Sequence, residues 1–172
     1  QQAVAAYGER GACDRAARLA TWVSHQYLIA CKASLSNGWL ARAERALEGR
    51  TDCSGAGWVA VEKARRADVK TAAAEALRAI ELGRGCGDDD LEVFAPSVLG
   101  QAEISAGEFD VGLVHLEEAM AAATAGRIRN PHTLAEAYCN MIAATTSAGD
   151  WERASEWCEL VGEHASSRSI LP

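Results

Sequence analysis

Two segments in the C-terminal half of the chain repeat one another, and this repeat constrains the fold more than any other sequence feature. The segment that begins at Val93 reads VFAPSVLGQAEISAGEFDVGLVHLEEAM, and the segment that begins at Ala135 reads AEAYCNMIAATTSAGDWERASEWCEL. Aligning Gly149 with Gly107 gives a repeat of 42 residues. A unit of this kind cannot bury its apolar face alone, so neighbouring units are expected to stack.

Within each copy, the repeated positions suit two helices joined by a tight turn. In the first copy, Gly107 ends one helix and Glu108 starts the next, where the helix dipole favours a negative charge. Phe109 is expected to pack in the elbow, and Gly112 is small enough to let the two helices cross closely. Both copies therefore predict a helical hairpin. The second copy has Gly149, Asp150, Trp151 and Ala154 at these positions.

A weaker form of the same pattern extends to the N-terminus. One helix is expected from about Cys13 to Ala33, and a second one opens at Gly38-Trp39. Asn130-Pro131 has the form of a helix start. Alanine, the best helix former, dominates the 49% of hydrophobic residues, and no segment reads as a strand. We therefore predict an all-α fold of eight helices in about four antiparallel hairpins, at about 12–49, 53–83, 88–125 and 130–166.

The charge balance argues against direct contact with nucleic acid. Lys and Arg total 17 against 24 Asp and Glu, which gives a net charge of −7, and such a surface repels phosphate. The sequence also has neither an apolar run long enough to span a bilayer nor a basic amphipathic face. We therefore expect neither nucleic acids nor membranes as partners.

The six cysteines favour a reducing compartment over a disulfide framework. They are spread through the chain without a C-x-x-C pair, and most fall inside helical patterns. We expect them to be small buried hydrophobes, and the protein to be cytoplasmic. They are Cys13, Cys31, Cys53, Cys86, Cys139 and Cys158.

The stretches LGQAEISAGEFDVGLVHLEEAM and AEAYCNMIAATTSAGDWERASEW resemble the tetratricopeptide repeat. They share its Leu-Gly step, its Gly-acidic pair before an aromatic residue and the alanine of its second helix. The period exceeds the usual one of about 34 residues, and an insertion at about 125–130 accounts for the excess. Ile142 replaces a usual glycine and Pro96 a usual aromatic residue. The resemblance implies a right-handed superhelix whose concave side is lined by the first helix of every hairpin.

A narrower resemblance covers most of the chain. The phrases NGWLARAERALEG, HLEEAMAAATAGRIRNPHTLAEAYCNMIAA and DWERASEWCELV are similar to the repeat region of actinobacterial LuxR-type, MalT-like transcriptional regulators. These large proteins often carry an N-terminal nucleotide-binding or cyclase domain and a C-terminal helix-turn-helix. The resemblance implies a sensor or coupling module, excised from a longer cytoplasmic regulator, that binds a small inducer or a protein partner and acts on the other domains of its parent.

No residue pattern points to catalysis, a metal or a cofactor. The glycine-rich stretch Gly83–Asp90 lacks the lysine of a phosphate loop. We expect a turn over Gly83–Gly87, followed by a capping box at Asp89 and Glu92. The four histidines have no H-E-x-x-H context, and no nucleophile can be matched with a base and an orienting group. We therefore expect a protein that is not an enzyme.

Candidate binding residues follow from the repeat register. Polar side chains on the first helix of each hairpin are expected to face the concave groove, and Trp58 is the tryptophan least explained by core packing. The other tryptophans are expected in the core, and Arg65-Arg66 is expected mostly on a solvated face. An alternative to the regulator module is a stand-alone interaction scaffold that captures a peptide in this groove. The candidates are His25, Lys32, Trp58, Arg65, Gln101, Glu136 and Asn140.

An excised array should also self-associate. Cutting a stack of hairpins exposes the apolar face that the missing neighbour would cover. Sedimentation at increasing concentration should show a homo-oligomer, and a species that stays monomeric throughout would contradict this expectation.

Overall fold

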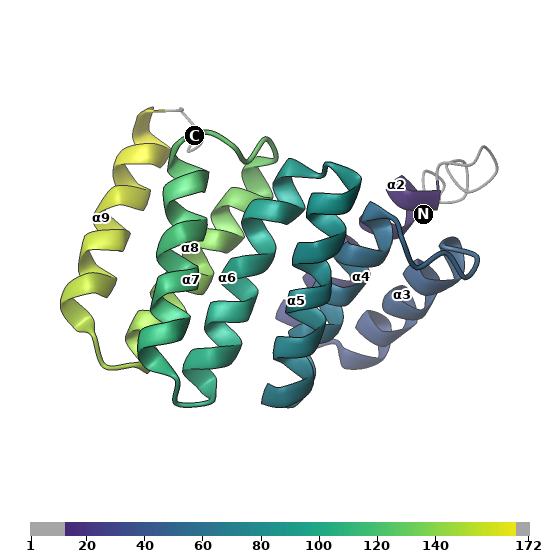
Figure 1. Cartoon of the computed structure of the whole chain (residues 1–172), viewed down its shortest axis with the longest axis horizontal. Helices are drawn as coiled ribbons and strands as arrows, with labels where there is room; N and C mark the ends of the chain where they lie inside the picture. The colour runs from purple at the N-terminus through teal and green to yellow at the C-terminus, as the bar shows by residue number, and fades with distance from the viewer. Residues whose placement is uncertain (1–12, 168–172) are drawn as a thin grey trace.

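The computed structural model describes residues 13–167, with side chains up to residue 163. This part of the chain forms eight helices and no strand, so the predicted all-α class is confirmed (Figure 1). The helices are α2 (Cys13–Ile29), α3 (Ala33–Ala46), α4 (Ser54–Ala64), α5 (Val69–Cys86), α6 (Asp89–Ser105), α7 (Phe109–Thr124), α8 (Pro131–Ser147) and α9 (Trp151–Ser167).

Each helix packs against its neighbours in sequence, and a second set of contacts joins alternate helices. Short turns connect α2 with α3, α4 with α5, α6 with α7, and α8 with α9, and the members of each pair pack together. Contacts also run from α2 to α4, from α4 to α6 and from α6 to α8. In Figure 1 the helices succeed one another along the long axis, with α2 and α3 near one end and α9 at the other. The alternate helices α2, α4, α6 and α8 therefore form one continuous layer.

The turns between helices are built as the glycine pattern predicts. Gly107 has a φ of 90° and Gly149 a φ of 77°, the left-handed conformation that closes a helix without steric cost. The N–H of Glu108 donates to the carbonyl of Glu103 at 2.9 Å, which satisfies a carbonyl that the helix end leaves free. Asn130 caps α8 by accepting from the N–H of His132 at 3.0 Å. These helix ends are therefore set by local sequence.

The core is centred on α6, which is apolar around most of its circumference. Leu91 and Phe94 of α6 are fully buried, together with Leu116, Met120 and Met141 of α7 and α8. Pro96 lies inside α6 without ending it, although its ring nitrogen cannot donate to the preceding turn. A second, smaller apolar cluster lies between α2, α3 and α4, and most of its buried members are alanines.

The closest approach of two helices occurs where α6 crosses α7. A Cβ atom on Gly100 would lie 2.4 Å from the carbonyl oxygen of Gly112, and a Cβ atom on Gly112 would lie 2.6 Å from that of Gly100. Both contacts are with backbone atoms, which cannot move aside as a side chain can. The predicted close crossing at Gly112 is therefore confirmed, and its counterpart on α6 is Gly100.

Four predicted boundaries are wrong. The first helix ends at Ile29, and α3 starts at Ala33 and not at Gly38, because Cys31 turns the chain with a φ of 56°. The helix α5 runs through the predicted turn at Gly83 and ends at Cys86, since Gly83 lies directly against the backbone of Glu92. Asp88, and not Asp89, caps α6 by accepting from the N–H of Leu91 at 3.1 Å.

Burial was also predicted wrongly at several positions. Trp22 is 42% exposed and Trp151 is 69% exposed, whereas both were expected in the core. Trp151 is the first residue of α9, where the chain has only begun to turn back towards α8. Cys13 alone among the six thiols is fully buried, all six are unpaired, and four of them are exposed on outward helix faces or in turns. The exposed thiols are Cys31, Cys86, Cys139 and Cys158.

The crossing at Gly100 gives a test of the fold. We predict that Gly100→Ala lowers the free energy of unfolding by about 1–3 kcal/mol, because the new methyl group forces two backbones apart. Gly38→Ala is the matched control, since a Cβ atom there meets nothing within 4 Å, and it should stabilise α3 by up to about 1 kcal/mol. Urea unfolding of both variants measures the difference, and equal effects at the two positions would contradict the close crossing.

Candidate functional site

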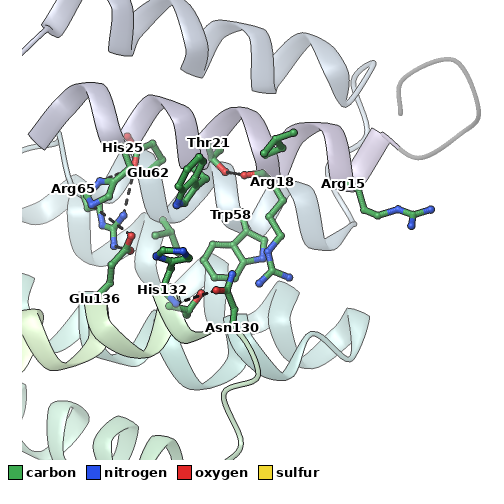
Figure 2. A pocket seen from close by; sticks show the side chains of 14 residues that line it. Arg15, Arg18, Thr21, His25, Trp58, Glu62, Arg65, Asn130, His132 and Glu136 are labelled. Atoms are coloured by element: carbon green, nitrogen blue, oxygen red, sulfur yellow. Dashed lines mark hydrogen bonds and ion pairs between the residues drawn. The ribbon is translucent and has the colours of Figure 1, made fainter. Parts of the chain in front are cut away.

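A cavity of about 420 Å³ opens between α2, α4 and the beginning of α8 (Figure 2). Its size falls in the range of small-molecule sites. The walls come from the first, second and fourth hairpins, which are far apart in sequence. The cap and first turn of α8 contribute Asn130, His132 and Thr133. The continuous layer of alternate helices therefore brings together residues more than one hundred positions apart.

The middle of the cavity is apolar and aromatic. Trp22 of α2 faces His132 of α8 with their ring centroids 6.0 Å apart. Trp58 of α4 lies deeper, 8% exposed, and stacks on Phe94 of α6 at 5.9 Å. Leu19, from α2, is a further apolar lining residue. A ligand here would contact rings on two sides of the array.

Arg18 closes one end of the cavity. Its Nη2 atom donates to the Oδ2 atom of Asp90 at 2.7 Å, and its Nη1 atom lies 3.7 Å from the carboxylate of Asp88. The guanidinium group also lies 4.5 Å from the ring centroid of Trp58. This arginine is therefore held by two carboxylates and one aromatic face.

Asp88 accepts the hydrogen bonds that hold the Arg18 end of the cavity together. The Nε1 atom of Trp58 donates to it at 2.9 Å, and the hydroxyl of Ser54 donates to the same oxygen. Burial alone would raise the pKa of the Asp88 carboxyl, but these donors, the N–H of Leu91 and the charge of Arg18 outweigh it. The pKa of Asp88 is therefore lowered, and the group is an anion at neutral pH.

Glu62 holds the other end of the cavity. It is 1% exposed, and its carboxylate contacts Arg66, the Nη1 atom of Arg65 at 3.6 Å and the Nδ1 atom of His25 at 3.5 Å. Arg65 also donates from Nη2 to Glu136 of α8 at 2.6 Å, and the Nε2 atom of His25 lies 3.8 Å from the same carboxylate (Figure 2). Charged side chains of α2, α4 and α8 thus form one cluster.

The surroundings of Glu62 favour its ionised form. Burial alone would raise the pKa of its carboxyl group. Contacts from His25 and Arg66, together with the charge of Arg65, more than offset burial and hold the pKa below the ordinary value. Glu62 is therefore a buried anion whose charge is balanced by its neighbours.

Arg66 extends this cluster into the first hairpin. Its Nη2 atom donates to the hydroxyls of Ser24 at 2.8 Å and Ser36 at 2.7 Å, which join α2 to α3 by exchanging hydrogen bonds with each other's backbone. The expectation that Arg65-Arg66 lies mostly on a solvated face is therefore wrong. Both arginines are largely buried because Glu62 precedes them by three and four residues, so that their side chains reach back to it from the end of α4.

Four of the seven candidate residues lie together in this cavity, namely His25, Trp58, Arg65 and Glu136. The others lie elsewhere. Lys32 is exposed in the turn before α3, Gln101 is half-buried on α6, and Asn140 donates from Nδ2 to the hydroxyl of Ser97 at 2.9 Å.

Several lining residues were not found from the sequence. Trp22 and His132 resemble ordinary helix residues, and only the meeting of α2 with α8 gives them a shared role. Glu62 carried a readable signal, because it is the first charged residue in the otherwise apolar run SGAGWVAVEKA. A carboxylate in such a setting is expected to need buried cationic partners.

Other kinds of site were also sought within residues 13–167. In that range no group of three or more His, Cys, Asp or Glu residues is placed to hold a metal ion. None of the helices there combines the length and apolar character needed to cross a bilayer.

No known protein family, no curated protein and no solved structure shows significant similarity to this chain. The likeness to tetratricopeptide repeats and to LuxR-type regulators therefore stays a prediction from the sequence.

The charge cluster gives a test of the site. We predict that Glu62→Gln lowers the free energy of unfolding by about 3 kcal/mol at neutral pH, because it leaves two largely buried arginines short of a counter-charge. Glu44→Gln is the matched control, since it breaks the exposed 2.8 Å ion pair with Lys63 and should cost less than about 1 kcal/mol.

The same pair of variants predicts a pH dependence. Because the folded-state pKa of Glu62 is lowered, its ionised form stabilises the fold above the ordinary pKa of a glutamate, and this contribution is lost as the pH falls through the lowered value. The stability difference between wild type and Glu62→Gln should therefore shrink in acid. A difference that stays constant across urea titrations from neutral to acidic pH would contradict this account.

Proposed function

We propose that this chain is a non-enzymatic helical-repeat module that binds an effector in the cavity between α2, α4 and α8. The observation that carries the proposal is that one aromatic-walled cavity is shared by the first, second and fourth hairpins. A ligand held there contacts both ends of the array at once. Its binding free energy can therefore favour one relative placement of those ends over another.

The contacts around the cavity support a coupling role. Glu136 joins α8 to Arg65 of α4, and Asp90 of α6 joins Arg18 of α2 to the backbone N–H of Arg129, just before α8, at 2.6 Å. Both bridges connect the fourth hairpin to earlier ones and both border the cavity. A ligand that displaces Trp22 or His132 lies between these two sets of contacts. Its binding can therefore change how far apart the helices on either side are held.

We further propose that the module belongs to a cytoplasmic bacterial transcriptional regulator and that its hairpins form a right-handed superhelix. The sequence phrases similar to LuxR-type regulators support this, and the acidic balance of the chain fits a part that does not itself contact DNA. The coding sequence on either side tests the idea. It should encode a helix-turn-helix or a nucleotide-binding domain, and a parent gene with neither would rule out the regulator.

The rival function is peptide capture by a stand-alone scaffold. Arg65 and Glu136, two of the residues expected to grip a peptide, are bound to each other at 2.6 Å. An extended peptide would have to break that pair, whereas a small molecule fits beside it. The geometry therefore favours a small effector over a peptide in this groove.

An effector screen tests the proposed function. Thermal unfolding measured against a collection of bacterial metabolites should reveal a compound that stabilises the wild-type protein, by about 2.7 kcal/mol at one hundred times its dissociation constant. We predict that Leu19→Trp, which fills the cavity, abolishes this stabilisation. Leu77→Trp on the exposed face of α5 is the matched control and should keep it. Binding that survives Leu19→Trp would exclude the cavity as the effector site.

A further inference from the structure

We infer that the cavity selects an uncharged, planar aromatic molecule that carries a hydroxyl or carbonyl oxygen, and that the hydroxyl of Thr133 and the indole N–H of Trp22 form hydrogen bonds with that oxygen. The inference rests on the proposed function, since it names the class of effector for the same cavity. Three independent features of the lining lead to it: the pairing of its charges, the form of its aromatic walls and the polar groups that have no partner.

The charges around the cavity are already balanced inside the protein. Arg18 is paired with Asp88 and Asp90, and Arg65 is paired with Glu62 and Glu136. His25 lies between Glu62 and Glu136, so a positive charge on its ring would face a carboxylate on either side.

Arg15, the remaining charged lining residue, is exposed, and its side chain extends away from the cavity in Figure 2. A charged ligand would therefore enter without a partner or would break an existing pair, and either change is unfavourable in a partly desolvated site. A neutral ligand avoids this cost.

The aromatic walls select for a flat ligand. Trp22 of α2 remains 42% exposed, and it lines the cavity opposite His132. The rings are inclined by 56° and do not stack on each other, so their faces are not satisfied by mutual contact. A planar ring inserted beside Trp22 would bury apolar surface and gain aromatic contacts.

Thr133 supplies the polar group that orients the ligand. The residue is 5% exposed and lines the cavity, yet its hydroxyl makes no hydrogen bond within the described part of the chain. The hydroxyl is not among the buried side-chain atoms without a partner, so it is accessible from the cavity, where a ligand atom can hydrogen-bond to it. The indole N–H of Trp22 also donates to no described residue. A ligand oxygen that reaches both groups would satisfy two donors.

Three probes with one ring system and different charges test the charge selection. They are 2-naphthol, which is neutral at pH 7, the 2-naphthoate anion and the 2-naphthylmethylammonium cation. Binding is followed by the indole N–H resonances in nitrogen-15 NMR spectra, with the Trp22 signal assigned through Trp22→Phe. We expect 2-naphthol to shift the Trp22 signal and to bind at least about tenfold more tightly than either ion.

The outcomes separate this inference from the proposed function. Tighter binding of the anion or the cation that Leu19→Trp abolishes would overturn the inference and leave the effector site intact. Failure of all three probes to shift the Trp22 signal would also overturn it, even where the metabolite screen has found another ligand. The proposed function itself fails only when neither the screen nor the probes yield binding that is sensitive to Leu19→Trp.

A second variant pair tests the role of the hydroxyl. Thr133→Val keeps the shape of the side chain and should weaken 2-naphthol about fivefold, because one hydrogen bond is lost. Thr146→Val, on the same helix but outside the cavity, should bind as the wild type does. Thermal unfolding of both variants confirms that they are folded, and unchanged affinity in Thr133→Val would overturn the assignment of this hydroxyl.

Discussion

The buried carboxylate of Glu62 is the constraint on which the arrangement of hairpins depends. Apolar packing between alanine-rich helices is non-directional, whereas a buried anion must be met by donors at fixed positions. Glu62 is met by Arg65 and Arg66, which directly follow its own helix, and these arginines reach Glu136 of α8 and the serine pair that joins α2 to α3. One ionised group thereby fixes the relative positions of the first, second and fourth hairpins.

The cavity follows from the same requirement. Ion pairs close it at both ends, with Arg18 at one and the Glu62 cluster at the other, and these pairs hold α2, α4 and α8 around the space between them. Trp58 completes the floor because its indole donates to Asp88 while its ring stacks on Phe94. Trp58 thus belongs to both the polar and the apolar part of the site, which places an aromatic wall directly beside paired charges.

Local signals in the sequence were sufficient for the helices and for many of their ends. Gly107, Gly149 and Asn130 each act through the chain next to them, so their roles could be predicted without the fold. Features that depend on contacts distant in sequence were predicted poorly. Trp22 was expected in the core, but its environment is set by His132 more than one hundred residues away. The repeat register placed His25, Trp58, Arg65 and Glu136 on the layer that forms the site, and it could not show that three of them would engage each other.

The glycine pair that brings α6 and α7 into backbone contact has a mechanical consequence. At the equivalent position of the last hairpin, Ile142 and Ala154 stand where Gly100 and Gly112 stand in the third, so side chains there separate the two backbones. The two hairpins therefore differ in how closely their helices pack. The two helices of the third hairpin also pack against each other more extensively than α8 and α9 do, so we expect a ligand at His132 to shift α8 against α9 more easily than α6 against α7.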